Sequence, residues 1–251
     1  MTKSLSELPA VHFSGEDIMS GEFPALQARN AIEHGPIYKW AIDDGMDSGE
    51  YVFMVGPEAN RFVLHTGRHH FSHEQGWTPI IGDSLGKGLL NMDDPEHARH
   101  RKMWNPAFTG AYMESYLPVI QRVIAERAGR WPERDRVDLY TEAREITFDA
   151  AAAALGGFQT GAEVDRLRSL FYTLLHGFDG GSETWEEFYT KMLRTRDELG
   201  AMLIGLIAER RHLPDGQQPR DVVGMMARAR DEEGRALSDE QLLAHVNILL
   251  V

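Results

Sequence analysis

His97 and Arg101, two basic residues four positions apart, are the side chains in this sequence best spaced to hold one anion. The preceding Asp94-Pro95 predicts a turn, and the residues after it predict a helix. Residues four apart on a helix share a face, so both side chains could contact one carboxylate, to which a guanidinium offers a rigid fork of donors. From spacing alone a solvated basic face is the commoner outcome, and it is supported by the neighbouring basic residues Arg99, His100 and Lys102.

Clusters of histidine raise the question of metal binding. His69 and His73 lie four residues apart with His70 between them, and His97 and His100 lie three apart. A zinc site needs three or four ligands with supporting partners, and neither cluster contains the acid of a motif such as His-Glu-x-x-His. We therefore expect structural or surface histidines rather than a metal site. The sequence also lacks a Gly-x-Ser-x-Gly elbow, a phosphate loop and a dinucleotide fingerprint.

Composition argues against several classes of function. A net charge of −13 over 251 residues disfavours binding to a phosphate backbone, and no long basic stripe offsets it, so no nucleic-acid partner is expected. The absence of cysteine excludes disulfides and cysteine metal ligands and fits a reducing compartment. Residues 1–9 contain no sustained apolar run, so we expect neither a signal peptide nor a membrane anchor and predict a cytoplasmic protein.

The first third of the chain predicts a short helix, a hairpin and a loop. A helix is expected over residues 24–33, strands over residues 37–40 and 51–55 with a turn at residues 43–49 between them, and a second short helix over residues 57–64. Residues 76–88 are punctuated by glycine and predict a loop, which could line an apolar pocket or pack its bulky side chains on the core. The apolar candidates for a pocket in this segment are Trp77, Ile80, Ile81 and Leu85.

The rest of the chain predicts helices, so the fold class is mainly α with a small β-hairpin. Apolar residues recur every three or four positions over residues 113–130, 139–155, 163–176, 185–211 and 221–230. A last helix begins at Ser238, which can form a capping box with Gln241, and continues to the final residue, Val251.

The last helix is almost entirely apolar and stops without a C-terminal cap, which suggests a truncated chain. Such an end is expected to leave apolar side chains unburied, at about 1.5–3 kcal/mol for each. The isolated chain is therefore expected to aggregate or to fold only in part. The side chains concerned are Leu242, Leu243, Val246, Leu249 and Leu250.

Four segments, in order, resemble the N-terminal portion of the cytochrome P-450 monooxygenase family. They are residues 34–38; residues 94–108 with their Asp-Pro-Glu-His start and Pro-Ala-Phe end; residues 221–226 with 230–234; and residues 237–242 leading into 248–251. Residues 1–251 would then be the N-terminal part of a single domain, ending at the start of the long central helix of that fold.

The resemblance implies roles for individual residues. His97 and Arg101 match positions that bond haem propionates, whereas Ile248 and Val251 match the part of the central helix that borders the substrate pocket. The segment 76–88 matches the region that covers an apolar substrate. The cysteine that ligates haem iron in this family, the later Glu-x-x-Arg helix and the oxygen-handling stretch are missing, so no catalytic residue or metal ligand is expected in these residues.

Three hypotheses for function remain open. The first is part of a haem-dependent monooxygenase that inserts one oxygen atom of O₂ into an apolar organic substrate, with electrons from a ferredoxin or a flavoprotein reductase; the 251 residues alone would be inactive. The second is a truncated protein that binds haem or an apolar ligand without oxygen chemistry. The third, an acidic helical interaction protein, explains the composition but not the four ordered segments.

Overall fold

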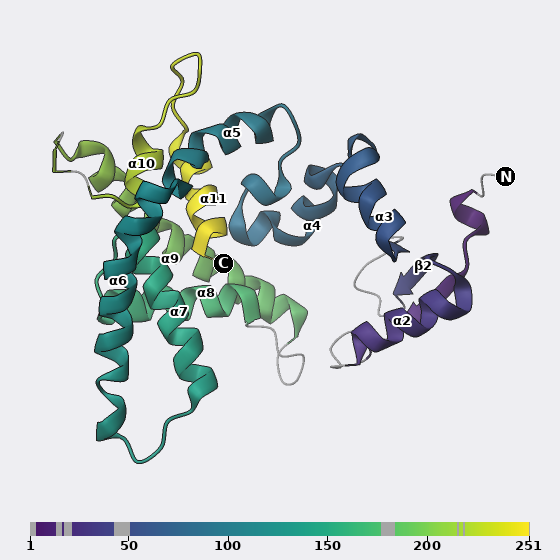
Figure 1. Ribbon diagram of the computed structural model, residues 1–251, viewed down its shortest axis with the longest axis horizontal. Coiled ribbons are helices and arrows are strands. Elements are labelled where there is room, and N and C mark those ends of the chain that lie inside the picture. The colour runs from purple at the N-terminus through teal and green to yellow at the C-terminus, as the bar shows by residue number, and fades with distance from the viewer. Residues whose placement is uncertain are drawn as a thin grey trace. The chain divides into compact units, whose positions relative to one another are not determined.

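The computed structural model describes residues 4–13, 17, 22–42, 51–176, 184–214, 216–217 and 219–250. The chain divides into two compact units, Met1–Phe71 and Ser72–Val251. Figure 1 gives the order of the elements along the chain.

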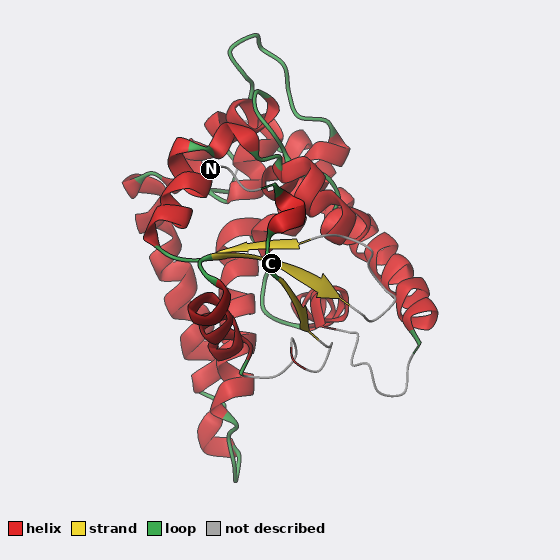
Figure 2. Cartoon of the chain, turned by 90° about the vertical axis from the view of Figure 1, so that its right-hand side faces the viewer, coloured by secondary structure: helices red, strands yellow, loops and turns green. Residues whose placement is uncertain are grey.

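The first unit contains a three-stranded sheet, shown in yellow in Figure 2, and short helices. Strand β2 (Ile37–Ile42) pairs antiparallel with β3 (Tyr51–Met54), which confirms the predicted hairpin, although its turn lies outside the described residues. Strand β1 (Ala10–Phe13), which the sequence analysis missed, pairs parallel with β2. Helices α2 (Phe23–His34) and α3 (Pro57–Arg61) agree with the predictions, and a π-helical turn follows at Phe62–Thr66.

Helices of the second unit surround a large apolar core. The bounds are α4 (His73–Leu85), α5 (Glu96–Trp104), α6 (Gly110–Ala128), α7 (Leu139–Gly156), α8 (Ala162–His176), α9 (Trp185–His212), α10 (Val222–Arg228) and α11 (Asp239–Leu250). The six helices from α6 to α11 match the predicted ranges closely. Their shared core includes Leu167, Phe171, Leu199, Leu203 and Met226, which are almost fully buried.

The predicted loop at residues 76–88 is wrong over most of its length, because residues 73–85 form helix α4. Ser72 caps this helix by accepting a hydrogen bond from the Gln75 amide at 3.0 Å. The carboxylate of Asp93 accepts further bonds from the amides of His73 (2.7 Å) and Glu74 (3.3 Å). A negative charge at the start of a helix is favourable, and here a residue twenty positions away supplies it, which offsets the cost of the internal glycines and proline.

The expected exposure of the last helix is also wrong. Leu242, Val246 and Leu250 of α11 are 0%, 2% and 6% exposed, and Leu243 and Leu249 are partly buried against the same core. Helices α7, α9 and α10 contact α11 and supply this burial. These five side chains therefore give no reason to expect aggregation of the chain.

The start of α11 is capped as the sequence predicts. The predicted capping box of α11 is present, since the Gln241 amide donates to Ser238 Oγ at 3.1 Å and the Ser238 amide donates to Gln241 Oε1 at 3.0 Å. Among the helices of the described residues, none has the length and apolar run that crossing a bilayer requires.

Candidate functional site

Helix α5 brings His97 and Arg101 onto one face, as their spacing predicts. Asp94 starts the helix by accepting a hydrogen bond from the Ala98 amide at 3.2 Å, and its carboxylate lies 3.7 Å from His97 Nδ1. The His97 side chain is 40% exposed. The Arg101 side chain is exposed and forms no ion pair with another described residue. This face of α5 therefore offers available donors.

The other two cations of α5 are already paired. Arg99 Nε donates to Asp231 Oδ2 at 2.6 Å, and Lys102 Nζ lies 2.9 Å from Glu232 Oε1. Burial works to raise the pKa of Asp231, but hydrogen bonds from the Arg235 backbone and from the side chains of Arg99 and Arg235 outweigh it and hold that pKa below its usual range. The basic residues of α5 thus lie on two faces. Arg99 and Lys102 form ion pairs with the loop after α10, whereas His97 and Arg101 form what we call the available face.

A third face of α5 is buried and meets α11 through two histidines. His100 Nδ1 lies 2.8 Å from His245 Nε2, and both side chains are fully buried. Arg99 Nη1 lies 3.4 Å from His100 Nε2, and because arginine only donates, His100 must carry its proton on Nδ1 and donate to His245. A neutral His245 then carries its proton on Nδ1, which has no partner among the described residues. Trp104 packs edge-on against His245, at 5.2 Å between ring centres, and its Nε1 also lacks a partner.

Burial strongly disfavours the charged form of both imidazoles. Desolvation lowers the pKa of His245 to about 3, with a smaller contribution from neighbouring His100. Desolvation is also the largest cause of the lowered pKa of His100, followed by the charge of Arg99. The pair is therefore neutral at physiological pH and joins α5 to α11 by a hydrogen bond between uncharged rings.

A groove of about 600 Å³ lies between the end of α4, the middle of α9 and the start of α11. Gly86, with a φ of 82°, turns the chain here, and Gly88 lets the backbone approach α11, since a Cβ at Gly88 would lie 2.3 Å from Ile248 Cδ1. Asn247 lines the groove, and its Nδ2 donates to the carbonyl of Leu85 at 3.3 Å, whereas its buried Oδ1 has no partner among the described residues.

The predicted pocket residues are only partly brought together. Leu85 is buried and lines the groove, while Ile248 packs against Gly88 beside it. Trp77 and Ile80 are 47% and 59% exposed, Ile81 is partly buried, and none of the three lines the groove. Val251 lies outside the described residues.

The roles of His100, His245 and Asn247 were not predicted from the sequence. A signal for the last two was present, since a histidine and an asparagine interrupt an otherwise apolar helix and must find polar partners once buried. Which partners they find depends on segments far away in the chain.

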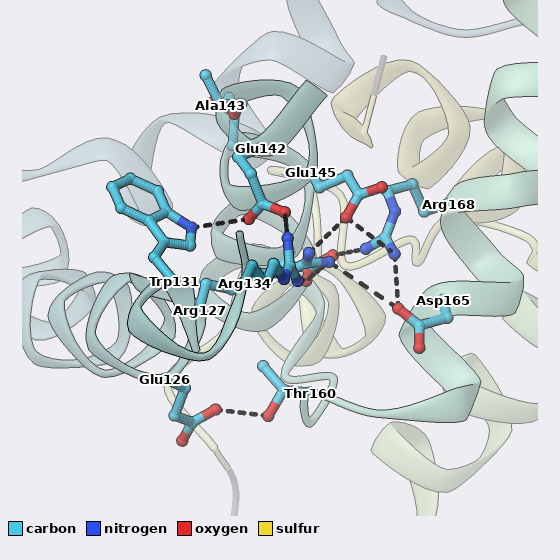
Figure 3. A network of polar contacts seen from close by, with 12 residues as sticks. Glu126, Arg127, Trp131, Arg134, Glu142, Ala143, Glu145, Thr160, Asp165 and Arg168 are labelled. Atoms are coloured by element: carbon cyan, nitrogen blue, oxygen red, sulfur yellow. Dashed lines mark hydrogen bonds and ion pairs between the residues drawn. The ribbon is translucent and has the colours of Figure 1, made fainter. Parts of the chain in front are cut away.

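Elsewhere, helices α6, α7 and α8 are joined by the network of charges in Figure 3. Arg127 Nε donates to Asp149 Oδ2 at 2.8 Å, and Arg127 also pairs with Glu145. Arg168 pairs with the other oxygen of Asp149 and donates to Asp165 Oδ1 at 2.6 Å. Two nearly buried guanidiniums thus share one buried carboxylate, an arrangement that holds helices together and leaves few free donors.

In the described part of the chain, no three side chains of the metal-ligating types are grouped to hold an ion.

Comparison with known sequences gives one family. A family model described as Cytochrome P450 matches residues 16–251. A protein of Mycobacterium tuberculosis (strain ATCC 25618 / H37Rv), provisionally named cytochrome P450 136, is 26% identical over 207 residues, which cover 80% of this chain and 41% of that protein. A protein of Synechocystis sp., provisionally named cytochrome P450 120, is 27% identical over 220 residues, or 87% of this chain and 48% of that protein. The chain thus spans about half the length of these relatives.

Solved structures share the same fold. The retinoic acid-bound cyanobacterial CYP120A1 matches with a TM-score of 0.77 at 24% identity, over 97% of this chain and 56% of that chain. The haem domain of cytochrome P450DA matches with a TM-score of 0.74 at 18% identity, again over 97% and 56%. The mainly helical second unit and the small sheet are therefore those of the corresponding portion of this fold.

Proposed function

Because the chain belongs to the cytochrome P450 family, we propose that it is the N-terminal part of a single haem monooxygenase domain, which inserts one oxygen atom of O₂ into an organic substrate. Family membership implies haem as the cofactor. The observation that supports a role for this portion is the available face of α5, where His97 and Arg101 remain accessible while Arg99 and Lys102 are paired.

The residues on this face fit the carboxylates of haem. Arg101 offers a fork of donors that no described carboxylate occupies, and the imidazole of His97 lies one helical turn away with much of its surface open. We assign these two side chains to the haem propionates, which they would hold and orient. Bound haem would supply the redox chemistry that activates O₂. The chain has no cysteine, so the thiolate ligand and the catalytic groups would come from residues outside these 251.

Other parts of the chain would shape the substrate site. The groove beside α11 combines the apolar surfaces of Leu85 and Leu243 with polar side chains, and its volume suits a small organic molecule. Electrons would come from a ferredoxin or a flavoprotein reductase. The isolated 251 residues would then have no monooxygenase activity.

Haem titration of the purified chain tests this proposal. We expect haem uptake, measured by the rise of haem absorbance, to weaken several-fold in two variants: Arg101→Gln removes the charge of a donor to a propionate, and His97→Leu removes a donor altogether. Lys102→Gln is the matched control, since it removes a cation of the same helix that is already paired with Glu232. Equal affinity in all four proteins would refute the assignment of propionate binding to α5.

A further inference from the structure

One stripe of α11 forms a wall of the groove and runs from an exposed end to a buried end. Glu240, Leu243, Ala244 and Asn247 follow the spacing i, i+3, i+4 and i+7, and all four line the groove. Glu240 is exposed, whereas Asn247 is 5% exposed. Seven residues of helix separate the two polar side chains by about 10 Å along the axis. The wall is thus polar at both ends and apolar between them.

The buried end presents a hydrogen-bond acceptor. Because Asn247 Nδ2 donates to the Leu85 carbonyl, the orientation of the amide is set and the other atom must be the oxygen. That Oδ1 is buried and accepts no hydrogen bond from any described group. A buried acceptor without a donor is unfavourable, so a ligand that brings a hydroxyl or amine to this point would recover the missing bond.

The lining of the groove carries an excess of negative charge. Four carboxylates and two cations line the groove. Both cations are engaged: Lys87 lies 3.0 Å from Glu74 and 2.9 Å from Glu96, and Arg196 pairs with Asp197 at 2.8 Å. Of the two remaining carboxylates, Glu240 lies at the exposed end of the stripe and forms no ion pair with any residue that the structure describes. The carboxylate of Asp83 accepts a hydrogen bond from the Tyr189 hydroxyl at 2.7 Å, and the Asp83 carbonyl accepts one from Arg196 Nη1 at 3.1 Å.

We propose that this groove binds an amphipathic organic cation: a hydroxyl or amine donates to Asn247 Oδ1, an apolar body lies along Leu243 and Ala244, and a protonated amine lies near Glu240. The inference deepens the proposed function, on which it rests, by naming the substrate class of the groove. It differs from the purely apolar substrate that the sequence predicts, and it disfavours carboxylic acids, whose charge would be repelled at the exposed end.

Calorimetric titration of the haem-free 251-residue chain at low ionic strength tests the proposal with three ligands. The probe 8-aminooctan-1-ol has both polar groups on a chain that can span the groove, octan-1-amine lacks the hydroxyl, and 8-hydroxyoctanoic acid reverses the charge. We expect the amino alcohol to bind about five- to tenfold more tightly than octan-1-amine, as the loss of one buried hydrogen bond predicts. The hydroxy acid should bind more weakly than the amino alcohol.

Substitutions separate the two ends of the groove. Asn247→Leu should abolish the preference for the amino alcohol over octan-1-amine, and Glu240→Gln should reduce the preference for the amino alcohol over the hydroxy acid. Asp239→Asn is the matched control, because it removes an adjacent carboxylate that pairs with Arg211 and does not line the groove. Circular dichroism would verify that each variant is folded. The comparison of the three ligands on the wild-type chain remains valid even if a variant does not fold.

Equal affinities of the wild-type chain for all three ligands, or no detectable binding, would overturn the proposal. A preference that survives in Asn247→Leu would also overturn it, because the selectivity would then come from the overall acidity of the protein. Haem uptake is measured separately, so a chain that takes up haem and shows no selectivity refutes only the substrate class. A chain that is selective among the ligands, and whose haem affinity is the same in the wild type and the α5 variants, refutes only the assignment of the propionate face.

Discussion

Mild acid should destabilise this protein through the buried histidine pair, His100 and His245. In the native state desolvation lowers both pKa values, to about 3 for His245, whereas the unfolded residues titrate near 6.5. The unfolded state therefore binds more protons below pH 6.5, and the free energy of unfolding falls as the pH falls through this range. At pH 5, 1.5 units below the unfolded pKa, His245 alone accounts for a loss of about 2 kcal/mol, and His100 acts in the same direction.

The range from pH 7 to 5 separates this effect from the titration of carboxylates. Hydrogen bonds from Arg134 and Trp131 hold the pKa of Glu142 below its ordinary value of 4.5, so this carboxylate loses its contribution only below that pH. Burial raises the pKa of Asp221 above 3.8, which has the opposite sign and stabilises the native state as the pH falls. Such contributions are shared by the wild type and by a variant without the two histidines, so a comparison of the two cancels them.

Urea denaturation at pH 7, 6 and 5 measures the effect. In the double variant His100→Leu/His245→Leu, the loss of unfolding free energy between pH 7 and 5 should be smaller than in the wild type by about 2 kcal/mol or more, with a similar m-value. His212→Leu is the control, since His212 is exposed at the end of α9. If the wild type and the double variant lose the same free energy over this range, the burial of a neutral imidazole pair is refuted.

Three substitutions should change the free energy of unfolding measured by urea at pH 7. Arg168→Leu should lower this free energy by about 3 kcal/mol or more, because the buried carboxylate of Asp149 loses one of its two partners. Arg166→Leu is the control and should have a much smaller effect, since it breaks an exposed ion pair with Glu198. Equal losses in the two variants would contradict the role of the network. Gly157→Ala should lower the free energy of unfolding by at least 1 kcal/mol, since φ is 74° and the new Cβ would lie 2.6 Å from Arg210; an unchanged stability would refute this close contact. Gly76→Ala should raise it by about 0.5–1 kcal/mol, because the glycine lies within α4 with open space around its Cβ position; a loss would argue against the helix.

Helices with strong local patterns could be predicted from sequence, and elements that depend on distant partners could not. The spacing of apolar residues located α6 to α11 because burial of one face requires that spacing wherever the helix packs. Helix α4 was missed since Gly76, Pro79 and Gly82 oppose a helix locally, and the compensating carboxylate of Asp93 arrives from outside the segment. Strand β1 was missed because its four residues form a strand by pairing with β2, far along the chain.

The candidate site also contains some features that could be predicted from the sequence and others that could not. The common face of His97 and Arg101 follows from helical geometry, so their spacing was enough to predict it. Pairing of His100 with His245 spans 145 positions and depends on the packing of α5 against α11, which no local pattern contains. Asn247 could have been singled out as a lone amide in an apolar helix, but the groove that it lines requires α4 and α9 to be in place.

Unpartnered polar atoms in the buried part of the described chain are concentrated on α5 and α11. Four such atoms are present, and three of them belong to Trp104, His245 and Asn247. Each costs about 1–3 kcal/mol when no donor or acceptor reaches it, so a fold selected for stability alone would not gather them on two helices in contact. Trp104 and His245 lie where the buried face of α5 meets α11, and Asn247 lines the groove, so stability among the described residues does not explain this polar contact.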